Sequence, residues 1–456
     1  MSHHPPSESP LGLAGDAPET DSLPLECQED HAHEGRNFLW LTLHQVLIRI
    51  GWVFKTESIV MPYFLDLVGG GPVLRGWLMV LNRFGFSVPP VLYARSLKLM
   101  PQKRWSIAAT TLGMAAPFGL LAWVWWSGVW RSGEGAATWM PYLFLLAYAV
   151  FFTMTGMNQL AMHSIQGKLI REDRRGRLFA AVMIVGSPIA LYAAWRLMPG
   201  WLALPDGGFA LLFGATALLF ALASVAMLGV KESDDDFSEP PAPAHERLLE
   251  SWRIATGPGP CRGVALVAML YSTNFMLFPH YQALAREGAG EAFDVRSLMV
   301  WTLAQHTAVT LLTLIAGPMA DRFGNRLAVI FGVFGSTLGP TMAISLALAS
   351  TAVMNQWFWL VFLPLGFTPV TIKMIMNYTL ELVPREEHPR TVAAVGVCLA
   401  APVIVGSPLL GLLVGMLGSV PMFCLGLAVM LTAGAMAVRL SEPRHDRSDV
   451  TLTSGL

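Results

Sequence analysis

Charged side chains are scarce in this 456-residue sequence. Lysine and arginine number 30 and aspartate and glutamate 31, so charged residues make up 13% of the chain, about half the roughly 25% of an average soluble protein. The formal net charge of -1 provides no basic field that would attract a polyanion. This scarcity excludes a disordered chain, a nucleic-acid-binding protein and an ordinary soluble enzyme.

Cysteine is also scarce, and Cys27, Cys261, Cys398 and Cys424 form no CxxC pair. Their spacing favours neither a disulfide framework nor a metal site. The sequence contains no P-loop, no nucleophile elbow and no paired catalytic carboxylates. We therefore expect no enzymatic activity, no ATP-driven pumping, no cofactor and no bound metal.

Long apolar runs are what the sequence has in quantity: 54% of its residues are hydrophobic and its mean hydropathy is +0.51. A helix needs roughly 20 apolar residues to cross the hydrocarbon core of a bilayer. The runs predict an all-α membrane protein of twelve transmembrane helices. The predicted spans are 38–64, 74–95, 105–129, 139–165, 177–198, 208–230, 263–285, 297–320, 327–349, 356–380, 391–415 and 419–440. Asn355-Gln356 and residues 418–421 are predicted to separate adjacent spans within charge-free stretches.

The distribution of charge divides the chain into two helical halves with polar segments around them. Residues 1–36 lack the apolar segment of a signal peptide, so we expect a disordered cytoplasmic tail. The other predicted parts are an N-terminal six-helix bundle (37–230), a cytoplasmic linker (231–262), a C-terminal six-helix bundle (263–441) and a cytoplasmic tail (442–456). Lysine and arginine concentrate in the loops after spans two, four, eight and ten. This bias predicts an integral protein of the plasma (inner) membrane with both termini in the cytoplasm.

The two halves carry matching residues at a nearly constant offset. Asn-Arg at 82–83 matches Gln-His at 305–306 with an offset of 223, and Gly-Ser-Pro recurs at 186–188 and 406–408 with an offset of 220. These matches predict a duplicated six-helix unit. Internal repeats are common in secondary transporters, whose solute site lies near the membrane midplane between the repeats.

The sequence GPMADRFGNR at 317–326 forms the predicted loop between spans eight and nine. It resembles the signature loop of the major facilitator superfamily, G-x-x-x-D-R-x-G-x-R, at the place of that family's second copy. The resemblance implies twelve helices in two pseudo-symmetric bundles, with a gate at the cytoplasmic end. The residues it assigns to this gate are Gly317, Asp321, Arg322, Gly324, Arg326, Glu381 and Arg390, with Arg390 as the expected partner of Asp321.

The residue types in this loop suit a gate on physical grounds. Gly317 permits close helix approach, Gly324 permits a tight turn, and Asp321 suits a helix N-terminus, where the dipole favours an anion. The first-half copy departs from the pattern, because Lys98 stands at the position that corresponds to Asp321. We therefore expect the N-terminal half to close through other contacts, for example between its basic loop and the carboxylates at 172–173.

Polar side chains at membrane depth mark a candidate transport path, because a buried ionisable group needs a functional reason. In the superfamily, spans one, four, seven and ten line the central solute cavity, and most of these side chains lie on those spans. The candidate solute-binding residues are Gln45, Arg49, Glu57, Asn82, Arg83, Asn158, Gln159, His163, Asn274, His280, Lys373 and Asn377. For a single His or Asn, an interhelical hydrogen bond is the alternative. Arg83 either pairs with Glu57 or contacts the solute, and Glu57 either faces the cavity or lies with Lys55 near the outer end.

The candidate cavity carries more positive than negative charge, with Arg49, Arg83 and Lys373 against Glu57. This excess favours an anionic or zwitterionic organic solute, such as a carboxylate. The leading hypothesis is a secondary active transporter that moves a small organic solute by alternating access.

Coupling to protons is predicted to use a carboxylate or histidine at membrane depth, namely Glu57, His163, His280 or His306. The expected partners are a small-molecule solute, a coupling proton and the lipid bilayer, without nucleic acid, and we expect a monomer. Two alternatives stay open. One is a multidrug efflux antiporter of the same superfamily, and the other is a transporter-like sensor or assembly factor that moves nothing.

Overall fold

A computed structural model describes most of the chain. The described residues are 33–133, 135–235, 249, 252–253, 257–290, 293–384 and 387–442, without the side chains at 172, 173, 321, 389 and 390. The predicted tails and the middle of the predicted linker therefore lie outside the described residues, apart from their ends.

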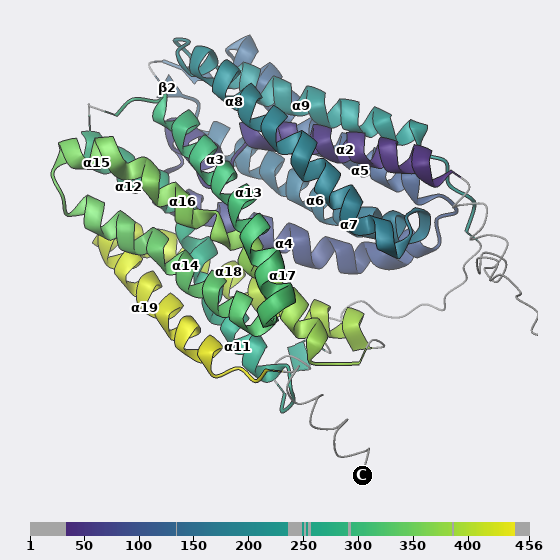
Figure 1. Cartoon of the computed structure of the whole chain (residues 1–456). Coiled ribbons are helices and arrows are strands. Elements are labelled where there is room, and N and C mark those ends of the chain that lie inside the picture. Colours follow the sequence, from purple (N-terminus) through teal and green to yellow (C-terminus); the bar gives the residue numbers. More distant parts are fainter. Residues whose placement is uncertain are drawn as a thin grey trace, which may run out of the picture.

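The first half of the chain is helical apart from one small hairpin (Figure 1). Its helices are α2 (Glu34–Phe54), α3 (Val60–Leu67), α4 (Gly71–Lys98), α5 (Lys103–Ser127), α6 (Met140–Leu169), α7 (Glu172–Ala181), α8 (Ser187–Leu202) and α9 (Phe209–Ala226). A π-helical turn, Val182–Gly186, joins α7 to α8, and a 3-10 turn, Met227–Gly229, follows α9. The hairpin pairs β1 (Arg131–Ser132) with β2 (Gly135–Ala136), in antiparallel register.

The second half repeats this pattern without a described strand. Its helices are α11 (Arg262–Tyr271), α12 (Thr273–Ala289), α13 (Ser297–Phe323), α14 (Asn325–Ala347), α15 (Thr351–Trp357), α16 (Phe362–Leu365), α17 (Phe367–Glu381), α18 (His388–Leu417) and α19 (Ser419–Val438), with a 3-10 turn at Phe358–Val361. Within the described residues, nine helical stretches are long and apolar enough to cross a membrane. The prediction of an all-α membrane protein is therefore confirmed.

The helices pack into two bundles that meet along a shared interface (Figure 1). In the first bundle α5 packs on α6 and α9, α4 on α6, and α2 on α9; in the second, α14 packs on α17 and α19, and α11 on α18 and α19. The contacts between bundles join α4 to α18 and α12, and α8 to α13. We call the end that carries Glu34 and Val438 the terminal end, and the opposite end, near the hairpin, the distal end.

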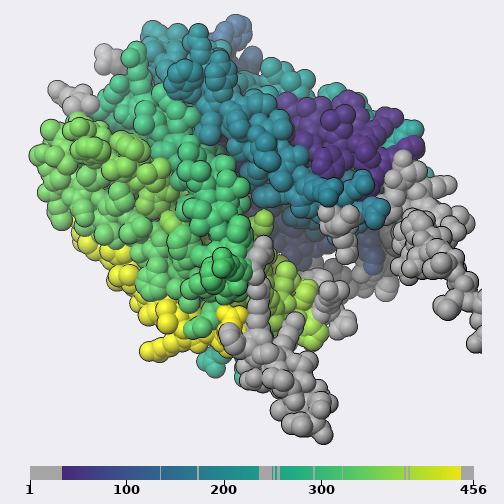
Figure 2. All heavy atoms as spheres, in the orientation of Figure 1, coloured from purple at the N-terminus to yellow at the C-terminus, as the bar shows by residue number. Residues whose placement is uncertain are grey.

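The bundles converge at the distal end and diverge toward the terminal end (Figure 1). In the space-filling view the blue-teal first bundle and the green second bundle lie side by side (Figure 2). Near the distal end α4 and α18 approach so closely that a β-carbon on Gly76 would collide with the Ser407 carbonyl, and one on Gly411 with that of Pro72. Small residues at these positions let the two helix backbones approach each other.

Two predicted helix boundaries were wrong. The span predicted at 38–64 breaks after Phe54, because Lys55 pairs with Glu57, and residues two apart do not face each other on an α-helix. The carbonyl of Thr56 instead accepts from the backbone N–H groups of the three residues at 59–61. Asn355-Gln356 is no helix break but lies inside α15, whereas Gly418, with φ +85°, separates α18 from α19 as predicted.

Candidate functional site at the bundle interface

Lys55 is the most deeply buried cation of the interface. Its side chain has 0% exposure, and its Nζ lies 2.9 Å from Glu57 Oε1. The same ammonium lies 3.2 Å from the ring centre of Trp52 and 4.1 Å from that of Phe151. Cation–π attraction strengthens when the cation is desolvated. Lys55 is therefore held by one carboxylate and an aromatic wall, away from solvent.

Glu57 is neutralised by its own bundle. Besides the Lys55 ion pair, its Oε2 accepts a hydrogen bond from Asn82 Nδ2 at 2.5 Å. The carboxylate keeps 18% side-chain exposure, so it borders the interface without offering a full unpaired negative charge there. Asn82 and Glu57, both predicted site residues, are thus brought together by the break between α2 and α3.

Arg83 reaches from α4 across to the second bundle. Its guanidinium carbon lies 3.5 Å from the ring centre of Phe275 on α12. Its Nε is buried without a hydrogen-bond partner, and within the described part of the chain it forms no ion pair. Arg83 therefore does not form the ion pair with Glu57 that was one predicted alternative. No described carboxylate pairs with its guanidinium at the interface.

The corresponding pair on α13, Gln305 and His306, lies opposite this group. Ser58 Oγ donates to Gln305 Oε1 at 2.5 Å across the interface, and His306 lies within electrostatic range of Arg49 and Lys55. Arg49 Nε in turn donates to Ser187 Oγ at 2.8 Å. The repeat read from the sequence at 82–83 and 305–306 thus meets at one place between the bundles.

The structure does not bring every predicted site residue to this place. Asn158 donates to Thr110 and Thr111 inside the first bundle, and Asn274 donates to Thr368 inside the second. Four other candidates differ in exposure: Gln45 and Asn377 are half-buried, and Gln159 and His163 are exposed. Lys373 is exposed as well, and its Nζ lies 4.2 Å from the ring centre of Phe179 on α7, across the interface.

The predicted gate of the second bundle is described only in part. Gly324 has φ +90° between α13 and α14, a conformation that favours glycine. Asn325 Nδ2 donates to Glu381 Oε1 at 2.9 Å, and Arg326 Nη2 donates to the Val438 carbonyl at 2.7 Å. Gly317 and the exposed Arg322 lie near the end of α13. The side chains of Asp321 and Arg390 lie outside the described residues, so their pairing stays a prediction.

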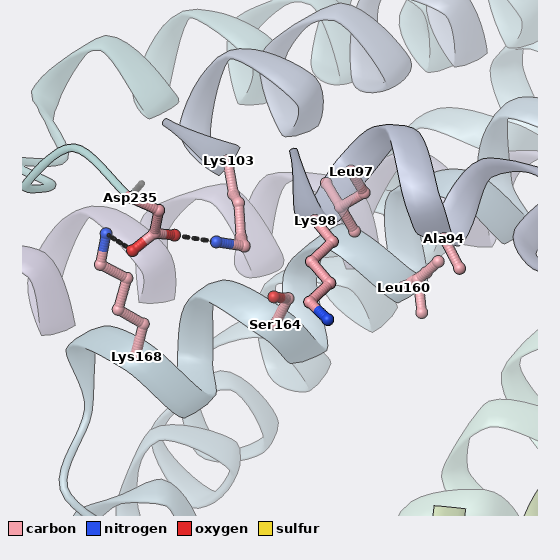
Figure 3. A pocket seen from close by; sticks show the side chains of 8 residues that line it. All are labelled: Ala94, Leu97, Lys98, Lys103, Leu160, Ser164, Lys168 and Asp235. Carbon is pink, nitrogen blue, oxygen red and sulfur yellow. Dashed lines mark hydrogen bonds and ion pairs between the residues drawn. The ribbon is translucent and has the colours of Figure 1, made fainter. Parts of the chain in front are cut away.

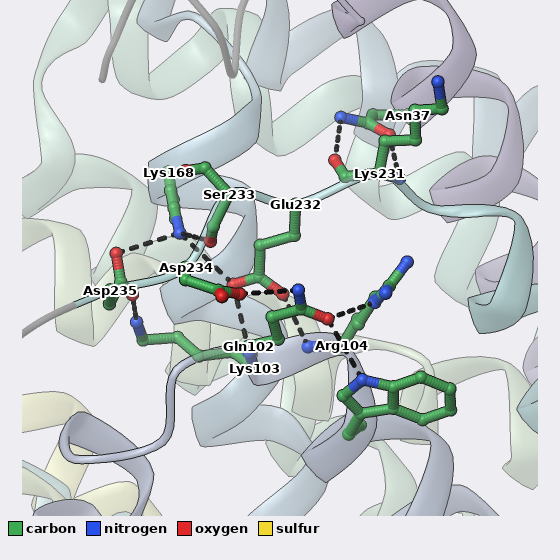
Figure 4. Close-up of polar contacts among 11 residues, drawn as sticks. Asn37, Gln102, Lys103, Arg104, Lys168, Lys231, Glu232, Ser233, Asp234 and Asp235 are labelled. Atoms are coloured by element: carbon green, nitrogen blue, oxygen red, sulfur yellow. Dashed lines mark hydrogen bonds and ion pairs between the residues drawn. The ribbon is translucent and has the colours of Figure 1, made fainter. Parts of the chain in front are cut away.

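In the first bundle Lys98 stands at the position that corresponds to Asp321, and the linker after α9 supplies a carboxylate at this end instead (Figure 4). Glu232 Oε1 and Oε2 accept from the backbone N–H groups of Lys103 and Arg104, at 3.0 and 2.8 Å. Glu232 therefore caps the N-terminus of α5, where an anion is stabilised by the helix dipole. Asp234 accepts from Gln102, and Asp235 pairs with Lys103 and Lys168. The signal in the sequence was the charge run KESDDD after α9, which was read only as a linker.

A second charged group, which the sequence reading missed, joins the bundles at the distal end. Asp66 Oδ2 accepts from Arg75 Nη1 at 2.6 Å within the first bundle. From α12 it also accepts from Gln282 Nε2 at 3.0 Å and from Arg286 Nη2 at 2.9 Å. Asp66 and Arg75 are each 2% exposed, and His280 is fully buried beside them. This distal cluster links the two bundles through one buried carboxylate.

The architecture and the site can now be compared with known proteins. Residues 294–454 match the family model of the Major Facilitator Superfamily. The whole helical arrangement resembles the crystal structure of a mutant of the nucleoside transporter NupG, with a TM-score of 0.70 at 9% identity over 89% of this chain and 100% of that one.

The family match thus covers residues of the second bundle. A POT family transporter in complex with 5-aminolevulinic acid is also similar in structure, with a TM-score of 0.65 at 11% identity over 89% of this chain and 97% of that one. No curated protein matches the chain in sequence. At these identities the solved structures establish the fold.

The contacts between the two bundles differ along the length of the interface. The distal cluster and the close approach of α4 to α18 tie the bundles at one end, while the bundles spread at the other (Figure 1). Arg83, Gln305 and His306 lie between these two levels.

Proposed function

We propose that the chain is a secondary transporter that moves a small organic anion by alternating access between its two bundles. The observation that carries this proposal is the state of Glu57, which is paired with Lys55 and bonded by Asn82. With Glu57 neutralised from within its own bundle, Arg49 and Arg83 leave the interface net positive. A carboxylate or zwitterion is the solute that this charge would bind, since arginine forms paired hydrogen bonds with carboxylates.

The distal cluster supports the alternating-access part of the proposal. Asp66 accepts hydrogen bonds from both bundles at once, so opening the distal end requires separating a buried carboxylate from its α12 partners. Solute binding between the bundles would offset that cost by drawing the terminal ends together. The two states would thus differ in whether the bundles contact each other at the distal end or at the terminal end.

We also propose proton coupling through groups at the interface. Glu57 and His306 are the two titratable candidates that border it, and both lie near cations. A proton on either group would change the charge that the solute meets. An inward proton gradient is then expected to stimulate transport of an anionic solute.

Uptake by purified protein in proteoliposomes tests the proposed solute class. We expect uptake of one or more small carboxylates or zwitterions, stimulated by a proton gradient, and no uptake of uncharged nucleosides. Nucleosides are the informative neutral set, because one similar structure is that of a nucleoside transporter, and 5-aminolevulinic acid is an informative zwitterion.

The control for this measurement is protein-free liposomes with the same gradients. Transport of nucleosides or of apolar drugs in preference to every anion would contradict the proposed solute class. Absence of any flux would favour a sensor or assembly factor instead.

A further inference from the structure

A cavity lies in the first bundle at the terminal end, away from the Arg83 site. It measures about 360 Å³ and lies between the ends of α4 and α6, beside the start of α5. Its lining residues are Ala94, Leu97, Lys98, Lys103, Leu160, Ser164, Lys168 and Asp235 (Figure 3). We call this the lysine pocket. Its volume falls in the range of small-molecule sites.

The wall of the lysine pocket already binds an oxyanion. The Asp235 carboxylate lies between two ammonium groups, pairing with Lys103 through Oδ2 and with Lys168 through Oδ1 at 2.9 Å (Figure 3). Burial alone would raise the pKa of Asp235, but hydrogen bonds from Lys103 and Lys168 and their positive charges outweigh burial and lower it. The environment therefore stabilises a negative charge at this point.

The rest of the lysine pocket has two chemical faces. Lys98 and the Ser164 hydroxyl line the pocket close to each other, and an ammonium and a hydroxyl suit the oxygens of a phosphate (Figure 3). Ala94, Leu97 and Leu160 provide an apolar floor. A ligand that combines an anionic head with a short apolar part matches both faces.

We propose that the lysine pocket is a binding site for a phosphate-bearing ligand, with Asp235 of the linker as its internal competitor. The ligand's phosphate would take the place of the Asp235 carboxylate between Lys103 and Lys168. Asp235 is also tied by its backbone N–H to the Pro101 carbonyl at 2.8 Å, so its release would loosen the linker from the loop between α4 and α5. An anionic lipid headgroup and a free phosphate compound share this chemistry. The proposal does not depend on which solute is transported.

The Asp235→Asn variant tests this competition, with Asp234→Asn as its matched control. Both remove one negative charge from neighbouring positions, but Asp234 binds Gln102 and not the lysines. Thermal shifts are measured for full-length protein in nanodiscs of phosphatidylcholine, titrated with inorganic phosphate against potassium chloride of equal ionic strength. A parallel set of nanodiscs contains phosphatidylglycerol and no added phosphate.

Removing an internal competitor raises apparent affinity by the reciprocal of the fraction of sites that it had left open, so a tenfold gain corresponds to about one open site in ten. We expect Asp235→Asn to lower the half-saturating phosphate concentration roughly tenfold relative to Asp234→Asn. Adding Lys168→Gln to Asp235→Asn should reverse this gain. A gain confined to phosphatidylglycerol nanodiscs would identify a lipid headgroup as the source, and a gain with inorganic phosphate a soluble one. Equal responses of the two aspartate variants in both sets would overturn the proposal.

Discussion

Replacement of Arg83 by alanine is expected to lower kcat/KM for the transported anion by about 10- to 100-fold. Arg83 is the interface cation that stacks on Phe275 of the opposite bundle and forms no described ion pair. A charge-assisted hydrogen bond contributes about 1.5–3 kcal/mol, and each 1.4 kcal/mol corresponds to a factor of ten. The measurement is initial uptake into proteoliposomes across a range of solute concentrations.

Two further variants make this result specific. Arg83→Lys keeps the charge but loses the planar, paired geometry, so it should retain part of the activity. Arg131→Ala removes an equal charge from the exposed hairpin and should leave uptake unchanged. Equal uptake by wild type and Arg83→Ala would remove Arg83 from the solute site and with it the basis for an anionic substrate.

Replacement of Glu57 by glutamine is expected to destabilise the protein by roughly 3–5 kcal/mol, the cost of leaving one member of a buried ion pair without its partner. The ammonium of Lys55, at 0% exposure, would then face a neutral amide and the rings of Trp52, Phe151 and Phe152 without the carboxylate that neutralises it. Lys55→Met should cost less, because Glu57 keeps 18% exposure and its hydrogen bond with Asn82. Thermal or chemical denaturation of the purified protein in detergent measures both effects.

The double variant separates an ion pair from two independent effects. If Lys55 and Glu57 stabilise each other, combining Lys55→Met with Glu57→Gln should restore most of the stability lost in Glu57→Gln. Glu287→Gln is a matched control, because Glu287 is half-exposed and lies 3.9 Å from Arg75. Its effect should stay within about 0.5 kcal/mol. Strict additivity of the Lys55 and Glu57 effects would show that the pair does not act as a unit.

Much of the architecture could be predicted because bilayer physics acts on local sequence. Long apolar runs bounded by polar or charged residues indicated helices such as α5 and α9. Glycine at 418 indicated the turn before α19. The internal repeat stays a prediction, but Asn82 and Gln305, which it matches, contact the adjacent residues Glu57 and Ser58. These features depend on neighbours in sequence or on a fixed offset.

The distal cluster and the linker contacts could not be read in the same way. Asp66 accepts hydrogen bonds from Gln282 and Arg286, which lie more than 200 positions away in the sequence. No local sequence pattern predicts such a distant partner. The break at Lys55 was missed for a related reason: helical periodicity describes residues three or four apart, whereas this ion pair joins residues two apart. In each case a buried charge overrode the local pattern.

Solute counterflow in proteoliposomes tests the central claim most directly. Vesicles containing wild-type protein are loaded with an unlabelled anion identified by uptake and then diluted into a trace of the same anion in labelled form. A site that is exposed alternately to the two sides predicts transient accumulation of label above equilibrium, which Arg83→Ala should reduce and Arg131→Ala should preserve. Label that only equilibrates, or enters at the rate of protein-free liposomes, would contradict alternating-access transport of an anion by this chain.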